Sequence, residues 1–170
     1  EAVKIAEQSD VILLSVGLSG WHSGESRSRA EITVPADQQQ LLDALKKTGK
    51  KIVVLLSTGR PMDIRNEVEK SDAVLLTWHG GTMAGPAVAD LVSGDKNPSG
   101  HLTMSFPYHV GQIPVHYNSK NTGRPAKSQF KAQGYSCSYV DIRNAPLFPF
   151  GYGLSYTEFE YSDLKVLTPT

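Results

Sequence analysis

Apolar runs of strand length recur along the chain, with amphipathic stretches between them. The runs are 11–17 (VILLSVG), 51–57 (KIVVLLS), 73–79 (AVLLTWH) and, more weakly, 101–106 (HLTMSF). Their apolarity is continuous rather than alternating, which is typical of strands that are covered on both faces of a sheet. The pattern therefore predicts buried strands of a mainly parallel sheet.

Helices are predicted in the intervening stretches. They cover residues 1–9, 35–49, 63–70 and 86–92. The second is the clearest, since Pro35 and Asp37 give a start signal, leucines recur at helical spacing and Gly49 gives a stop signal. The last ends at Gly94, before the turn sequence DKNPSG. The alternating order predicts an α/β fold, a three-layer α/β/α sandwich of the flavodoxin-like, doubly wound kind.

The C-terminal third has a different character. From Phe106 onward prolines and glycines break any period, which predicts a long irregular segment that is ordered by its aromatic residues. The stretch 147–167 restores strand character, with Gly151 and Gly153 marking a tight turn within it. We expect one domain over 1–161, with 162–170 beginning a linker to a following domain.

The first residues predict a piece of a longer polypeptide. The chain opens on EAVKIAEQSD, a helix already under way, with no initiator methionine and no strand before it. An N-terminally truncated fragment is the expected explanation, and a processed N-terminus is the alternative.

Composition excludes several classes of partner. The chain has 170 residues, which suits one domain, and 17 basic and 17 acidic residues give zero formal net charge. The long-range field that attracts nucleic acid or anionic lipid is therefore not expected, and no apolar run approaches the ~20 residues of a membrane span. The five histidines are dispersed, and Thr82 replaces the central glycine of a dinucleotide fingerprint in GGTMAG. We therefore expect no metal and no cofactor.

The candidate site lies in the loop after the first strand. A doubly wound sheet binds ligands beyond the carboxyl ends of its strands, and this loop carries Glu25, Arg27 and Arg29. Glu25 is a candidate general acid/base; the alternative is a surface ion pair with either arginine, which the spacing alone favours. A guanidinium lowers the pKa of a neighbouring carboxyl group, whereas an acid catalyst requires it raised. If Glu25 is catalytic, the arginines should point elsewhere.

Other residues at the same edge are weaker candidates. The possible pocket edge comprises Trp21, His22, Arg60, Trp78 and His79. Trp78 and His79 end a predicted strand and have the alternative of capping the core. Arg60 could bind a carboxylate or form a salt bridge that fixes its own loop.

Several stretches resemble one known family. GESRSRAEITVP, GKKIVVLLSTGRP, NPSG before a run that ends in FP, and FPFGYGLSYT are similar to stretches of the C-terminal α/β-sandwich domain of glycoside hydrolase family 3. Within this family, the quoted stretches most resemble those of the periplasmic bacterial β-glucosidases. The resembling stretches keep the family's order and cover nearly the whole chain.

The resemblance implies a retaining β-glycosidase that removes terminal non-reducing β-D-glucosyl residues without a cofactor. The nucleophile, an aspartate, would lie on an N-terminal (β/α)8 barrel outside this sequence, so the chain alone should be inactive. By its place relative to SR and ITVP, Glu25 matches the family's acid/base, and Arg27 and Arg29 would support the loop. Glu31 is the rival acid. A periplasmic or secreted location is implied, and a non-catalytic carbohydrate- or small-ligand-binding module is the alternative.

Overall fold

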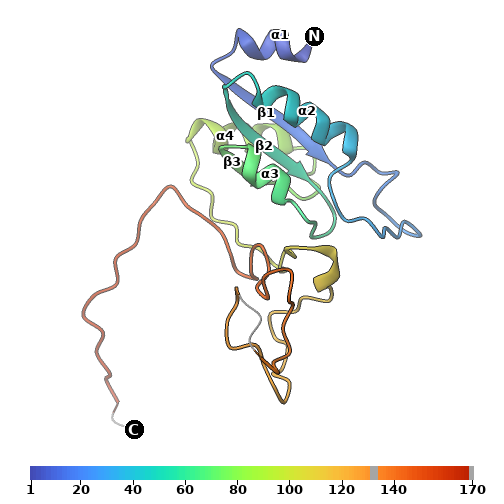
Figure 1. Ribbon diagram of the computed structural model, residues 1–170. Coiled ribbons are helices and arrows are strands. Elements are labelled where there is room, and N and C mark those ends of the chain that lie inside the picture. The colour runs from blue at the N-terminus through green and yellow to red at the C-terminus, as the bar shows by residue number, and fades with distance from the viewer. Residues whose placement is uncertain (131–133, 169–170) are drawn as a thin grey trace.

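A three-stranded parallel sheet forms the centre of the computed structural model, which describes residues 1–130 and 134–168 (Figure 1). Its strands are β1 (Val11–Gly17), β2 (Lys51–Ser57) and β3 (Ala73–Leu76), in the order β1-β2-β3. Val11 pairs with Lys51, and Val53 pairs with Ala73. Because all strands are parallel, their carboxyl ends meet at one edge of the sheet.

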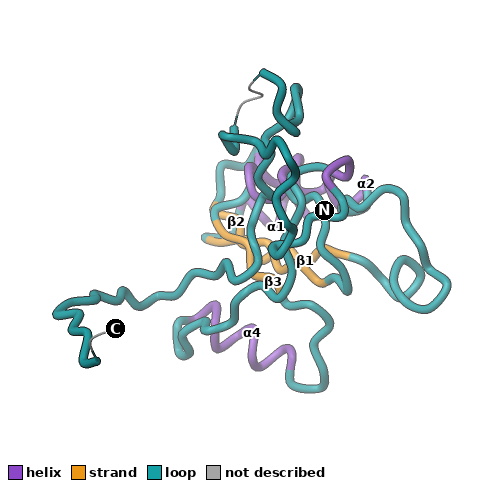
Figure 2. The backbone as a smooth tube through the Cα atoms, turned by 90° about the horizontal axis from the view of Figure 1, so that it is seen from below, coloured by secondary structure: helices purple, strands orange, loops and turns teal. Residues whose placement is uncertain are grey.

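Helices lie on both faces of this sheet. They are α1 (Ala2–Glu7), α2 (Ala36–Lys46), α3 (Arg65–Lys70) and α4 (Ala84–Ser93). α2 and α3 lie on one face and α4 on the other, while α1 contacts α2 (Figures 1 and 2). The predicted three-layer α/β sandwich with a parallel sheet is confirmed.

The hydrophobic core lies between the sheet and α2. Ile52, Val54 and Leu56, alternate residues of β2, are fully buried, and Leu42 and Leu45 of α2 are buried against the same face. Each such side chain contributes about 1.5–3 kcal/mol by leaving water. The core therefore holds β2 in place, and with it the loops that leave the carboxyl edge.

The predicted ends of helices and strands agree best with the structure where a nearby residue or apolar run determines them. β1 and β2 cover the predicted ranges, and Gly94 ends α4 in the left-handed conformation, with φ of 85°. β3 is shorter than predicted and ends at Leu76, because Trp78 has a φ of 50°, which no strand can continue through. α1, α2 and α3 begin one or two residues after their predicted starts, and α4 begins two residues before.

The prediction of a strand over 101–106 is wrong. This stretch contributes only an isolated antiparallel bridge between Phe106 and Phe148. The Phe106 N–H donates to the Phe148 carbonyl at 2.8 Å, and the Leu147 N–H donates to the Phe106 carbonyl at 2.9 Å. Pro107 and Pro149 follow directly and have no N–H to extend the ladder, so the pairing stops after one step.

The predicted strand character of 147–167 is wrong for the described part of the tail. Residues 154–168 form no strand. The Tyr156 N–H donates to the Asn97 side-chain oxygen and the Tyr156 hydroxyl to the Leu91 carbonyl, both at 2.8 Å, and the chain after them runs away from the body of the domain (Figure 1). A strand requires a partner, and the described chain presents none beside this segment. The tight turn before it is confirmed: Gly151 has a φ of 80°, and the Tyr152 N–H donates to the Pro149 carbonyl at 3.1 Å.

The described part of the segment after Phe106 is irregular, as predicted, and contains one short 3-10 helix, Val110–Gln112. No helix within residues 1–130 and 134–168 has the length and apolarity to cross a membrane.

Candidate functional site

Three loops leave the carboxyl edge of the sheet and are joined to one another. They cover residues 18–35, 58–64 and 77–83. The Leu18 N–H donates to the Ser57 carbonyl at 2.9 Å, and the hydroxyl groups of Ser57 and Thr77 lie 2.8 Å apart. The Asp63 N–H donates to the Ile32 carbonyl at 2.9 Å. These bonds make the three loops one connected unit.

Gly17 sets the direction in which the first loop leaves β1. Its φ is 142°, and a Cβ atom built on it would lie 1.8 Å from the Ser57 carbonyl oxygen. The Gln38 side chain also binds both backbone groups of Gly17, accepting from its N–H at 2.7 Å and donating to its carbonyl at 3.1 Å. Only glycine allows this close approach.

Glu25 stands at the second position of a tight turn. The Arg27 N–H donates to the Gly24 carbonyl at 3.2 Å, which closes a four-residue turn over 24–27. Ser26, at the third position, has a φ of 58°, where turns of this kind usually have glycine. Glu25 is exposed, and the loop that carries it projects beyond the sheet (Figure 1).

The Glu25 carboxylate forms no ion pair within the described chain: no Lys or Arg nitrogen there lies within 4 Å of it. Arg27 instead places its guanidinium 5.2 Å from the centre of the Trp21 ring. The Nε of Arg29 donates to the Glu31 carbonyl at 3.0 Å. Both arginines therefore point elsewhere, which is the arrangement that an acid/base role for Glu25 requires.

The loop contacts the rest of the edge on either side of Glu25. On one side, a Cβ atom at Gly59 would lie 2.9 Å from both the Ser23 hydroxyl and the His79 Nε2, so these two side chains pack against the Gly59 backbone. On the other side, Nη2 of Arg60 donates to the Arg27 carbonyl at 2.9 Å. Arg60 thus fixes a neighbouring loop through a backbone oxygen, not through a salt bridge.

The remaining candidates separate into surface and core. His22 bonds within the loop, its Nδ1 lying 3.0 Å from the Ser19 hydroxyl. Trp78 is half-buried, with its ring centre 6.0 Å from that of Phe106, and packs against the hydrophobic core. His79, the next residue, is exposed. The structure therefore brings Ser23, which sequence analysis missed, close to His79, and places Trp78 on the core.

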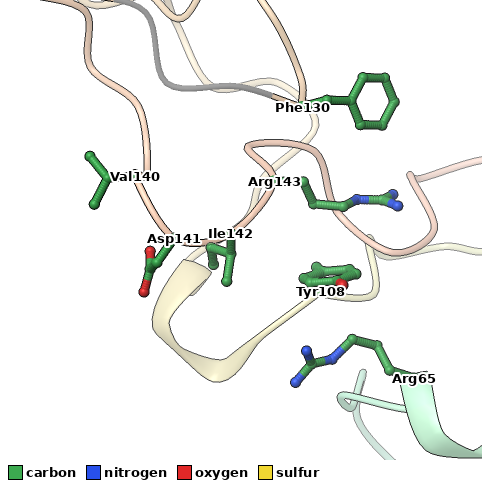
Figure 3. A pocket seen from close by; sticks show the side chains of 7 residues that line it. All are labelled: Arg65, Tyr108, Phe130, Val140, Asp141, Ile142 and Arg143. Carbon is green, nitrogen blue, oxygen red and sulfur yellow. The ribbon is translucent and has the colours of Figure 1, made fainter.

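A separate cavity of about 540 Å³ lies where α3 meets the irregular segment (Figure 3). Its lining comprises Arg65, Tyr108, Phe130, Val140, Asp141, Ile142 and Arg143. None of the residues predicted for the site is among them. Nothing in the sequence signals this cavity, because its walls come from three segments that are far apart in the chain.

Both arginines of this cavity are already engaged. The Tyr108 ring lies between two guanidinium groups, 4.6 Å from that of Arg65 and 5.0 Å from that of Arg143 (Figure 3). Asp63 binds Arg65 through both carboxylate oxygens, at 2.9 and 2.7 Å, and raises the pKa of its guanidinium. Arg143 donates to the Ala145 carbonyl at 3.2 Å. We assign this cluster to holding the irregular segment against α3.

No group of three or more His, Cys, Asp or Glu side chains suitable for a metal ion occurs in the described ranges. The expectation that the domain uses no cofactor stays a prediction.

In open α/β sheets, ligands bind beyond the carboxyl ends of the strands, and binding and catalytic residues lie disproportionately on loops. The Glu25 loop is in such a position. The chain belongs to glycoside hydrolase family 3: residues 1–156 match the model of the "Glycosyl hydrolase family 3 C-terminal domain". The resemblance seen in the sequence is thereby confirmed.

Individual relatives support the same assignment. The chain is 49% identical over 170 residues to the periplasmic beta-glucosidase of Salmonella typhimurium, covering 100% of this chain and 22% of that protein. It is 44% identical to a beta-xylosidase of Formosa agariphila over 98% of this chain and 22% of the relative. A crystal structure of beta-glucosidase from Listeria innocua has a TM-score of 0.88 and 48% identity, covering 94% of this chain and 22% of that one. The chain thus spans about a fifth of the length of these relatives.

Proposed function

We propose that this chain supplies the general acid/base to a retaining β-glycosidase of the β-glucosidase type, which hydrolyses terminal non-reducing β-D-glucosyl residues. The observation that carries the proposal is the Glu25 turn: an exposed carboxylate, free of arginine partners in the described chain, on a loop that projects from the carboxyl edge of a family 3 domain. Relatives named as β-glucosidases from Salmonella and Listeria support glucose as the sugar.

The domain would work with a partner on the same polypeptide. The relatives are several times longer than this chain, which supports further domains on the same polypeptide. The family resemblance implies that one of them is a preceding (β/α)8 barrel that carries the nucleophilic aspartate. Residues 1–161 would form the family 3 domain, and 162–170 would begin a linker to a following domain. The name of the Salmonella relative supports a periplasmic or secreted location.

The chemistry assigns Glu25 two successive roles. In the first step the nucleophile attacks the anomeric carbon and the C–O bond to the leaving group breaks, while Glu25 transfers its proton to the departing oxygen. In the second step the resulting carboxylate takes a proton from water, whose oxygen displaces the nucleophile. Such a mechanism requires the two carboxyl groups to lie ~5–5.5 Å apart. A projecting loop allows Glu25 to reach a nucleophile on another domain.

The experiment that tests this role compares the full-length protein with its Glu25→Ala variant on an activated aryl β-glucoside, with and without azide. The variant should lose roughly 10²–10⁴-fold in turnover, because water is no longer activated. Azide needs no general base, so it should restore turnover and yield a β-glucosyl azide.

Glu31→Ala is the matched control, because Glu31 lies in the same loop and is also exposed. It should retain the wild-type rate and gain nothing from azide. Wild-type turnover by Glu25→Ala would contradict the assignment, and azide rescue of Glu31→Ala in its place would move the role to that residue.

A further inference from the structure

The Glu25 turn has one polar connection to the body of the domain. Within residues 1–130 and 134–168, Arg60 is the only side chain outside the first loop that hydrogen-bonds to residues 19–31. Its Nη2 donates to the Arg27 carbonyl at 2.9 Å, and Arg27 is the residue that closes the turn. The bond therefore acts on the backbone two residues from Glu25.

The backbone of Arg60 is fixed by hydrogen bonds to the Thr58 side chain. The Thr58 hydroxyl donates to the Arg60 carbonyl at 2.8 Å and accepts from the Arg60 N–H at 3.2 Å. Thr58 is fully buried, directly after β2. The Arg60 backbone is therefore fixed next to the end of β2. Through its bond to the Arg27 carbonyl, the Arg60 guanidinium holds the loop in a fixed position relative to that strand.

The turn needs such a support because its conformation is unfavourable on its own. Ser26 has a φ of 58°, in the left-handed region that residues with a Cβ atom populate poorly. The loop is otherwise exposed over 24–28. Without a bond to the Arg27 carbonyl, rotation at Ser26 would redirect the Glu25 side chain.

We propose that Arg60 is a positioning residue, which orients the Glu25 carboxyl group by holding the carbonyl of Arg27. This inference rests on the proposed acid/base role of Glu25. Arg60 need not touch the substrate. Its loss should therefore reproduce the loss of Glu25 in a weaker form, on the same steps of the reaction.

The test uses the full-length protein and two substrates, phenyl β-glucoside and 2,4-dinitrophenyl β-glucoside. Phenolate is a poor leaving group that needs protonation, whereas 2,4-dinitrophenolate leaves without it. Arg60→Ala should lower kcat/KM for the phenyl glucoside by about 10²-fold, the effect of a misplaced catalytic group, and by less than about 3-fold for the dinitrophenyl glucoside. Azide should raise its kcat on the dinitrophenyl glucoside.

The double variant Glu25→Ala/Arg60→Ala separates positioning from a general structural effect. If Arg60 acts through Glu25, the double variant should be no slower than Glu25→Ala alone. Lys47→Ala removes an exposed cation at the opposite end of the sheet and should leave all rates unchanged. Should Arg60→Ala fail to fold, Arg60→Lys is judged by the same two substrates, because an ammonium group does not reproduce the planar guanidinium.

Equal losses on both substrates, or losses that multiply in the double variant, would overturn the positioning role. An unaffected Arg60→Ala beside an impaired Glu25→Ala would overturn this inference and leave the proposed function standing. An unaffected Glu25→Ala would overturn both.

Discussion

Glu67 is a buried acidic residue. It lies in α3 with 1% of its surface exposed, and neither carboxylate oxygen has a hydrogen-bond partner within residues 1–130 and 134–168. Burial raises the pKa of Glu67 above its usual value of 4.5, and the nearby Asp63 carboxylate acts in the same direction. The folded protein therefore holds this proton more tightly than the unfolded chain does.

The consequence is a loss of stability as the pH rises. Below pH 4.5 Glu67 is protonated in both states, and between 4.5 and its higher folded pKa only the folded state keeps the proton, so folding becomes less favourable through this window. Glu67→Gln should match wild type near pH 4 and be more stable near pH 8, by about 1–3 kcal/mol. Urea unfolding at both pH values measures the difference. Glu69→Gln, on the exposed side of the same helix, is the control and should show no such pH dependence. If Glu67→Gln differed from wild type in free energy of unfolding by the same amount at pH 4 and pH 8, the assignment would be refuted.

The residues of the site differ in how far the sequence reveals them. Glu25 could be singled out because it lies in a loop after a predicted strand and matches a family pattern. The bond from Arg60 to the Arg27 carbonyl could not, because a backbone oxygen has no signature in the sequence. Likewise, the proximity of Ser23 and His79 depends on Gly59, which looks like any turn glycine until the loops are placed together.

At the scale of elements, the sequence predicted the bounds of a helix or strand correctly where nearby residues determine them. Continuous apolar runs gave the bounds of β1 and β2, and Gly94 gave the end of α4. The prediction over 101–106 failed because strand formation depends on a distant partner, and here the pairing of Phe106 with Phe148 is stopped by flanking prolines. The apolar content of a stretch does not indicate whether another stretch of the chain is available to pair with it as a strand.

The junction between β1 and β2 gives a prediction at this scale. Gly17→Ala places a Cβ atom against the Ser57 carbonyl at a residue whose φ is 142°, so both overlap and backbone strain oppose it. We expect a loss of about 3 kcal/mol or more, a fall in Tm of roughly 6–12 °C. Gly20→Ala is the control, because its Cβ would meet nothing within 4 Å. Calorimetry that finds equal Tm values for the two variants would show that the close approach is not required.

On the scale of the whole molecule, the sheet is unevenly covered. β1 is an edge strand, and its residues Val11 and Leu13 are 49% and 52% exposed, while α4 is the one helix on its face of the described sheet (Figure 2). Exposed apolar side chains on an edge strand are typical of surfaces that pack against more polypeptide. This exposure supports the proposal that the domain works within a longer chain.

The proposed division of labour predicts that residues 1–170 alone do not turn over an aryl β-glucoside. Retaining hydrolysis needs a nucleophile and an acid/base on opposite sides of one bond, and the family resemblance implies that the nucleophile lies outside this sequence. The isolated chain should release 4-nitrophenol from 4-nitrophenyl β-glucoside no faster than buffer does, and azide should not change that rate, because there is no glycosyl-enzyme for it to intercept. The full-length protein under the same conditions is the positive control. Turnover by the isolated chain that Glu25→Ala abolishes would mean that this domain holds both carboxyl groups, and the two-domain account would then be wrong.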